Sequence, residues 1–200
     1  MIVSAVVVLL LLVGGLIYWN VSSTHADSAL GAALDIYGTP LAPAGAPAES
    51  GVFTSASDRS KAANQKFAEV AKDYGWLSQG AKAHYFVGLT DQELGQNAQA
   101  ESELKIAAGS WDHNLANLAK LALALLYHQT GRDSEAVDLF NAVAAKPSET
   151  VSTGMAQLDL AGMYASEGKM DQARELWAKV KDSDKDGAAG QIATQRLAGR

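Results

Sequence analysis

The residue types that most often carry out chemistry are sparse and dispersed in this sequence of 200 residues. Its histidines are His25, His84, His113 and His128, and no two of them have the spacing of a metal-binding motif. The chain has no cysteine, which excludes disulfides, thiolate ligands and a thiol nucleophile. No serine lies in a nucleophile elbow, and no glycine-rich phosphate loop follows a strand pattern. The sequence therefore predicts neither an enzyme nor a metal or cofactor site.

An acidic run near the C-terminus imitates the first half of a calcium-binding loop. The segment DSDKDG, residues 182–187, supplies Asp182, Asp184, Asp186 and a glycine. The twelfth position of such a loop would be Ala193, where calcium requires a bidentate glutamate. We therefore interpret the run as a turn with an aspartate cap before a terminal helix.

The charge balance excludes a further class of function. The formal net charge is -6 and the pI is near 5.1. Nucleic-acid binding needs clustered lysine and arginine, and the sequence contains no such cluster. We expect no nucleic-acid partner.

The N-terminal segment predicts a membrane anchor. Residues 2–19 carry no charge, and at ~1.5 Å per residue their helix just crosses a bilayer core. Tyr18 and Trp19 stand where interfacial aromatic residues are expected. We predict an anchor over residues 1–22, and the alternative is a signal peptide cleaved after Ala26. Because the first basic residue is Arg59, the flank is free to translocate, and we expect the rest of the chain outside the cytoplasm.

Beyond the anchor, the sequence has the apolar spacing of amphipathic helices. The period is clearest where Tyr127, Gly131, Ala136 and Phe140 recur 37 residues later as Tyr164, Gly168, Ala173 and Trp177. Gly95, Ala100 and Leu104 have the same internal spacing one period earlier. Helical pairs at a period of 36 to 37 residues indicate a solenoid.

Helix packing explains why these positions recur. The glycine follows the first helix of each pair, where a left-handed residue reverses the chain at low cost. The small residues allow the paired helices to approach closely, and the aromatic residues fill the space beside that contact. A single pair cannot bury its apolar face, so neighbouring pairs must stack.

The order of these residues resembles the tetratricopeptide repeat. Ala124, Tyr127, Gly131, Ala136 and Phe140 follow its small, tyrosine, glycine, alanine and aromatic positions. The predicted fold is therefore all-α, with a transmembrane helix followed by a tetratricopeptide-like solenoid of antiparallel helix pairs. The expected parts are a degenerate first repeat at 26–75 with a proline-rich insertion at 39–57, three repeats at 81–186 and a capping helix at 187–200.

The whole layout resembles one bacterial family. One membrane helix, a degenerate first pair, three repeats and a terminal helix are similar to the ancillary Sec-translocon subunits called YfgM-like. That resemblance implies a single-pass protein of the inner membrane whose repeats lie in the periplasm and bind translocon subunits and periplasmic chaperones. The alternatives are a secreted module or a self-associating scaffold of envelope assembly.

In such repeats the first helices line a concave face that binds protein segments. The resemblance therefore implies a partner-binding groove, which is either open or covered by the chain itself. The positions that correspond to this face are Lys82, Tyr85, Leu89, Gln92, Leu118, Leu121, Leu125, His128, Gln129, Met155, Leu158, Gly162 and Ala165.

Overall fold

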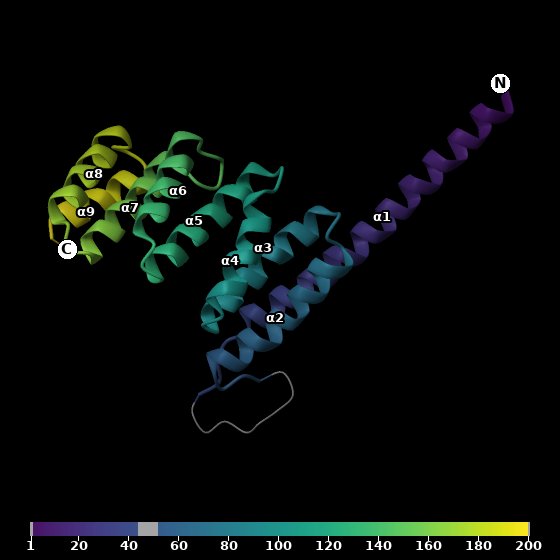
Figure 1. Ribbon diagram of the computed structural model, residues 1–200, viewed down its shortest axis with the longest axis horizontal. Coiled ribbons are helices and arrows are strands. Elements are labelled where there is room, and N and C mark those ends of the chain that lie inside the picture. The colour runs from purple at the N-terminus through teal and green to yellow at the C-terminus, as the bar shows by residue number, and fades with distance from the viewer. Residues whose placement is uncertain (1, 44–51, 200) are drawn as a thin grey trace. The chain divides into compact units, whose positions relative to one another are not determined.

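The computed structural model describes residues 2–43 and 52–199, which fold into helices joined by short turns (Figure 1). No strand occurs in these two ranges, where an isolated bridge joins Leu41 to Phe53. The predicted all-helical class is confirmed for them. Met1, Arg200 and residues 44–51 of the predicted proline-rich insertion lie outside the described residues. The helices are α1 Ile2–Gly38, α2 Ala56–Asp73, α3 Ser78–Glu93, α4 Asn97–Ala108, α5 His113–Gln129, α6 Asp133–Ala145, α7 Thr153–Ser166, α8 Met170–Ser183 and α9 Ala188–Leu197.

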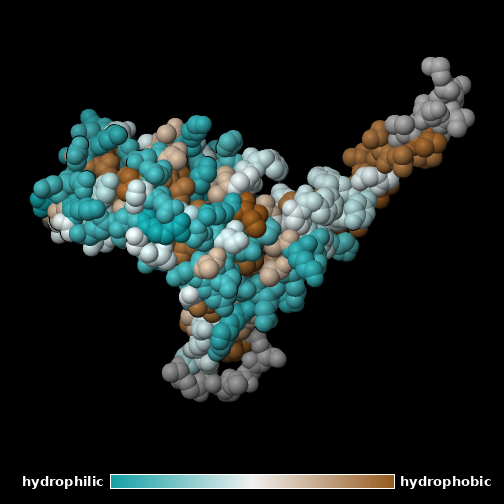
Figure 2. Space-filling view, in the orientation of Figure 1, coloured by the Kyte–Doolittle hydropathy of each residue, from teal (hydrophilic) through white to brown (hydrophobic). Residues whose placement is uncertain are grey.

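The first helix is apolar at its start and a core element at its end. Its stretch Leu9–Gly38 is long and apolar enough to cross a membrane, and Figure 2 shows the apolar surface that it presents. Further along, Ala26 and Ala33 are fully buried. The helix is continuous across residues 22–26, where the sequence suggested a boundary between anchor and first repeat. The polar residues there change the helix's surroundings but do not interrupt it.

One compact unit comprises residues 1–96 and so contains α1, α2 and α3. Helices α1 and α2 run antiparallel, because Tyr37 packs on Phe67 while Tyr18, earlier in α1, packs on Trp76, later in the chain. The core gathers Leu30 from α1, Phe67 from α2 and Val87 from α3. The end of α1 is therefore part of the folded unit.

The second compact unit comprises residues 97–200 and contains α4 to α9. Within it, α5 packs on α6, α7 on α8, and α9 on α8. Ala161 and Ala173 are fully buried beside Trp177, as expected where two helices approach closely. The division between the units falls inside the first of the three repeats predicted over 81–186. Helix α3 joins the core of the first unit, whereas α4 packs on α5.

Three turns between helices share one backbone geometry. Gly95, Gly131 and Gly168 have φ of 74°, 77° and 77°, a left-handed conformation that costs other residues energy. Each glycine N–H donates to a carbonyl three residues earlier, and the following N–H donates to one five residues earlier at 2.8 Å. These paired bonds are those of a Schellman motif. The predicted function of the repeated glycines is therefore observed.

Candidate functional site

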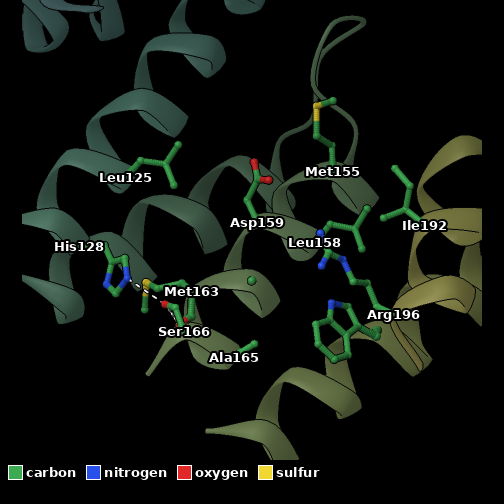
Figure 3. A pocket seen from close by; sticks show the side chains of 12 residues that line it. Leu125, His128, Met155, Leu158, Asp159, Met163, Ala165, Ser166, Ile192 and Arg196 are labelled. Atoms are coloured by element: carbon green, nitrogen blue, oxygen red, sulfur yellow. Dashed lines mark hydrogen bonds between the residues drawn. The ribbon is translucent and has the colours of Figure 1, made fainter. Parts of the chain in front are cut away.

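A groove in the second unit is the candidate functional site. It has a volume of about 650 Å³ and receives side chains from α5, α7, α8 and α9 (Figure 3). Its lining is mostly apolar, with a few polar groups among the apolar ones. The lining residues are Leu125, His128, Met155, Leu158, Asp159, Gly162, Met163, Ala165, Ser166, Trp177, Ile192 and Arg196.

Helical spacing brings these side chains together. On α7, Met155, Leu158, Gly162 and Ala165 are three or four residues apart and therefore share one face of the helix. An added Cβ at Gly162 would meet no atom within 4 Å, so the glycine leaves space at the groove surface. The groove thus follows one stripe of α7 and its neighbours.

Large apolar side chains in the groove remain in contact with solvent. Leu125 is 41% exposed, Met155 46% and Ile192 45%, whereas Trp177, which also lines the groove, is only 6% exposed. The three exposed side chains come from α5, α7 and α9. An apolar surface drawn from several helices is typical of a site that buries part of another molecule.

Asp159 adds a carboxylate to this apolar lining. It is partly buried, and no described residue hydrogen bonds or forms an ion pair with it. Burial raises the pKa of Asp159 because the charged form loses hydration. The groove therefore presents an acidic group that a bound cation would stabilise.

A polar cluster lies beside the groove, where α5 ends and α6 begins. His128 Nδ1 lies 2.7 Å from Asp133 Oδ1 and 3.6 Å from Glu167 Oε1, and His128 Nε2 lies 3.1 Å from Ser166 Oγ. The ligand atoms of His128, Asp133 and Glu167 all lie within 4.8 Å of one another, so among the described residues these three are close enough together to hold a metal ion.

A lysine of the same turn offsets part of the negative charge of this cluster. Lys169 Nζ lies 2.5 Å from Glu167 Oε2, and its positive charge offsets the carboxylate. The cluster joins α5 and α6 to the end of α7 through residues of the chain alone. We interpret it as a polar latch between successive helix pairs.

The structure brings together about half of the groove residues predicted from the sequence. Leu125, His128, Met155, Leu158, Gly162 and Ala165 line one groove. Leu118 is partly buried on α5, and Gln129 is exposed at the end of that helix but does not line the groove. Leu121 is 7% exposed, so at this position the predicted face is covered by the chain itself. It packs as a core residue.

The other predicted groove residues lie on α3 in the first unit. Lys82 is exposed there, while Tyr85, Leu89 and Gln92 are partly buried. The Tyr85 ring packs edge-on against Phe86, with 5.2 Å between centroids. Burial also raises the pKa of Tyr85. The Tyr85 side chain therefore packs within the first unit.

Sequence reasoning missed several residues of the groove. Asp159 lies four residues after Met155 and so belongs to the same helical stripe, but a search for apolar positions passes over it. Ile192 and Arg196 are also four residues apart, on the helix that the sequence assigned only a capping role. Counting every side chain of the α7 stripe, whatever its polarity, would have found Asp159.

Comparison with known proteins identified no relative of this chain among family models or curated proteins. No protein-family model matches the chain, and a search of curated proteins finds no match either. The groove is therefore interpreted from its own residues.

Proposed function

We propose that this protein is a membrane-anchored scaffold that binds other proteins through the groove between α5, α7 and α9. The observation that carries this proposal is the set of exposed apolar side chains around one groove of about 650 Å³. The volume is within the range of sites that enclose ligands. The apolar N-terminal helix supplies the anchor.

The occupant that fits this groove best is an amphipathic helix with a lysine or arginine on its apolar face. Its apolar side chains would cover Leu125, Met155 and Ile192, in the way that helices bind in apolar grooves. Its cation would pair with Asp159, which no described residue neutralises. A segment of this kind satisfies both the apolar and the acidic parts of the lining.

The resemblance to the YfgM-like family suggests where such partners are found. We propose that the second unit lies in the periplasm of a bacterium, with the anchor in the inner membrane. Its partners there would be subunits of the Sec translocon and periplasmic chaperones. The support for this assignment is the sequence layout of one apolar helix followed by helical pairs.

Retention of the anchor is supported by contacts on both sides of Ala26. The Gln79 side-chain amide donates to Ser23 Oγ at 3.1 Å and to Asp27 Oδ1 at 2.7 Å. Cleavage after Ala26, as a secreted module requires, would remove Ser23 and expose the buried Gln79. We expect the mature chain to have the mass of the uncleaved sequence; a mass that begins at Asp27 would establish the secreted alternative.

Crosslinking in cells tests the scaffold. A photoreactive residue at Leu125 is expected to crosslink translocon subunits and periplasmic chaperones. Met170 is the matched control, because it is 40% exposed but does not line the groove. Crosslinks from Leu125 only to a second copy of the chain would favour the self-associating scaffold, and equal crosslinking from both positions would rule out the groove as the site.

The charge of the occupant is tested with peptides. The full chain in detergent is titrated with a labelled amphipathic peptide that carries one lysine on its apolar face, and with the same peptide carrying norleucine. We expect Asp159→Asn to weaken binding of the lysine peptide by at least about tenfold, as for loss of a partly buried charge pair. Binding of the norleucine peptide should be unchanged or tighter. Equal losses for both peptides would show that no cation pairs with Asp159.

A further inference from the structure

An exposed tryptophan lies beside the apolar half of α1. Trp76, in the turn between α2 and α3, is 54% exposed. Its ring stacks on Tyr18, with 5.9 Å between centroids and 7° between the ring planes. Tyr18 and Trp19 are themselves 66% and 53% exposed, so three aromatic rings are in contact with the surroundings of the molecule at one level of α1.

The turn is fixed to α1 by polar contacts as well. Gln79, the second residue of α3, is 6% exposed and donates to Ser23 and Asp27 of α1. The Leu77 N–H donates to the Tyr74 carbonyl at 2.8 Å, which closes the turn around Trp76. Because α1 is continuous from Ile2 to Gly38, no flexible linker separates the apolar segment from this turn.

We propose that the α2–α3 turn is a lipid-binding surface, with Trp76 inserted beside Tyr18 and Trp19 into the interfacial region of the bilayer. The proposal rests on the anchoring of α1 in a membrane and adds a second contact with it. The partner is the lipid headgroup layer.

The length of the apolar segment determines this position. Residues 2–19 form about 27 Å of helix, and a bilayer core is about 30 Å thick. A segment of that length has no apolar residues to spare, so Tyr18 must lie at the edge of the core when the segment spans it. Trp76 is stacked on Tyr18 and therefore lies at the same depth.

The chemistry of tryptophan agrees with that depth. Its indole has a large apolar body and one N–H donor, and tryptophan is accordingly enriched where membrane meets water. In water an indole that is 54% exposed would leave much of its apolar surface hydrated. In the interfacial layer the same surface is covered by lipid. The contact would fix the depth of the first unit and its rotation about α1.

Fluorescence quenching by brominated lipids tests the proposal. Trp19, Trp111 and Trp177 are replaced by phenylalanine so that only Trp76 emits. Phenylalanine suits position 177 because Phe140 occupies the equivalent position in the preceding pair. The full chain is reconstituted into vesicles whose lipids carry bromine either near the headgroup or near the chain ends, and helix content by circular dichroism confirms folding.

We expect lipids brominated near the headgroup to remove most of the Trp76 emission, and those brominated near the chain ends to remove much less. The control is a chain in which all four native tryptophans are replaced and Leu34→Trp supplies the only indole. Leu34 is an exposed α1 position in the same unit, about 24 Å further along the helix than Tyr18. Emission from this control should be unaffected by both lipids.

A third chain, with Trp19 as its single tryptophan, separates two kinds of failure. Quenching of Trp19 without quenching of Trp76 would overturn the lipid contact of the turn and leave the anchor intact. Absence of quenching from both would overturn the anchor and, with it, the lipid contact. Equal quenching of Trp76 and of the Leu34→Trp control would show that the unit has no defined depth, which also contradicts the proposal.

Discussion

The helix pairs α5–α6 and α7–α8 have the same backbone at their turns and different side chains around it. In the first turn the Arg132 N–H donates to the Tyr127 carbonyl at 2.8 Å, and in the second the Lys169 N–H donates to the Tyr164 carbonyl at the same distance. The glycine before each cation has φ of 77°. The repeated residues therefore reproduce one turn closely.

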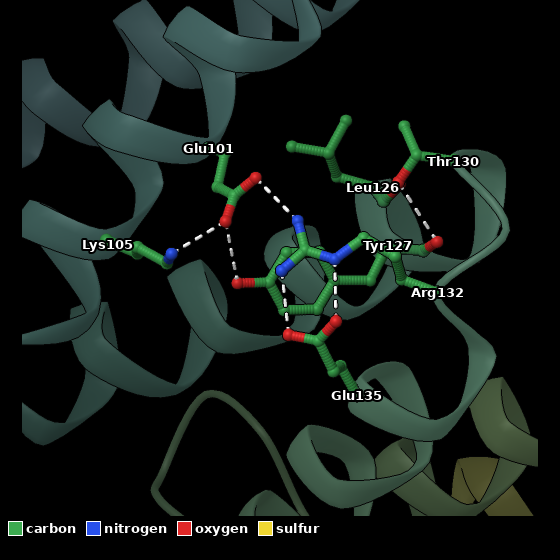
Figure 4. Close-up of polar contacts among 7 residues, drawn as sticks. All are labelled: Glu101, Lys105, Leu126, Tyr127, Thr130, Arg132 and Glu135. Carbon is green, nitrogen blue, oxygen red and sulfur yellow. Dashed lines mark hydrogen bonds and ion pairs between the residues drawn. The ribbon is translucent and has the colours of Figure 1, made fainter.

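The cations of the two turns make different contacts. The Arg132 guanidinium lies 3.8 Å from the Tyr127 ring centroid and forms 2.6 Å ion pairs with Glu101 on α4 and Glu135 on α6 (Figure 4). Lys169 Nζ lies 5.7 Å from the centroid of the Tyr164 ring and pairs with Glu167 of its own turn. Arginine makes more contacts than lysine because its planar guanidinium has five donors and stacks on aromatic rings.

This difference separates two kinds of position in the repeat. Glycine, small and aromatic positions determine the backbone and the packing, so they recur. The cation after the glycine determines which neighbour the turn contacts. Arg132 ties its turn to the preceding α4, whereas Lys169 neutralises a carboxylate of the latch.

The largest loss of stability is expected at the aromatic position that the two helix pairs share. Phe140 is fully buried and Trp177 is 6% exposed, so replacing either with alanine should destabilise the chain by about 3–5 kcal/mol. Exchanging the two aromatic residues tests whether the two positions differ in size. Trp177→Phe should cost less than its alanine variant because it retains a ring, while Phe140→Trp should cost about 1–3 kcal/mol by overpacking. Urea unfolding of the full chain in detergent measures both costs; a Phe140→Trp variant as stable as the unchanged chain would show that position 140 has room for an indole.

The next largest loss of stability is expected at the turn glycines. Gly131→Ala and Gly168→Ala should each cost about 1–2 kcal/mol, because alanine is strained at a φ of 77°. No atom lies within 4 Å of an added Cβ at either position, so the cost comes from the backbone alone. Thermal unfolding measures it, and the two variants should agree.

Gly162→Ala is the matched control for these variants. It also has free space for a Cβ, but it lies inside α7 and has no left-handed φ. The substitution should therefore stabilise the chain by up to about 1 kcal/mol. Destabilisation at all three glycines would contradict the backbone explanation.

The turns and the close helix contacts could be predicted because they depend on nearby residues. Gly131, Ala136 and Phe140 keep their spacing in the next pair, and spacing can be read directly from a sequence. The apolar segment of α1 is equally local. Its continuity across residues 22–26 was missed, because the change from apolar to polar composition suggested a boundary that helical hydrogen bonding does not require.

The polar features could not be predicted because they join residues of different helices. Glu101 meets Arg132 only when α4 packs on α5, and Glu167 approaches His128 from another helix pair. Asp159 was missed for a different reason. A charge on an apolar stripe weakens the periodic signal, so the method that found the stripe excluded its most informative member.

A smaller effect is expected at the tie between Arg132 and α4. Its charge pairs and hydrogen bonds lower the pKa of Glu101 from its usual 4.5 to about 2, with Arg132 the main cause. Because the pKa is lower in the folded chain, this stability is fully present above about pH 4.5 and is lost as the pH falls towards 2. Glu101→Gln should cost about 1 kcal/mol at pH 7 and much less near pH 2.

Glu135→Gln is the control for this tie. It removes a carboxylate that pairs with the same Arg132, but Glu135 is more exposed and lies only three residues further along the chain, in the first turn of α6. Its effect in urea unfolding at pH 7 should be smaller than that of Glu101→Gln. A larger effect would mean that Arg132 acts within its own turn, as Lys169 does.

The smallest expected effect on stability is at Asp159, which stands where the preceding pair has the buried Ala122. Burial raises the pKa of Asp159, so the folded chain binds more protons than the unfolded chain between the ordinary value of 3.8 and the raised one. Stability therefore falls as the pH rises through that window and stays lower above it. Asp159→Asn should raise stability at pH 7 by less than about 1 kcal/mol, with no gain below the ordinary pKa. Asp138→Asn, at an exposed α6 position, removes the same charge and should give no such pH dependence. A variant that is more stable and yet binds the lysine peptide less tightly would show that Asp159 is kept for its partner at a cost to the fold.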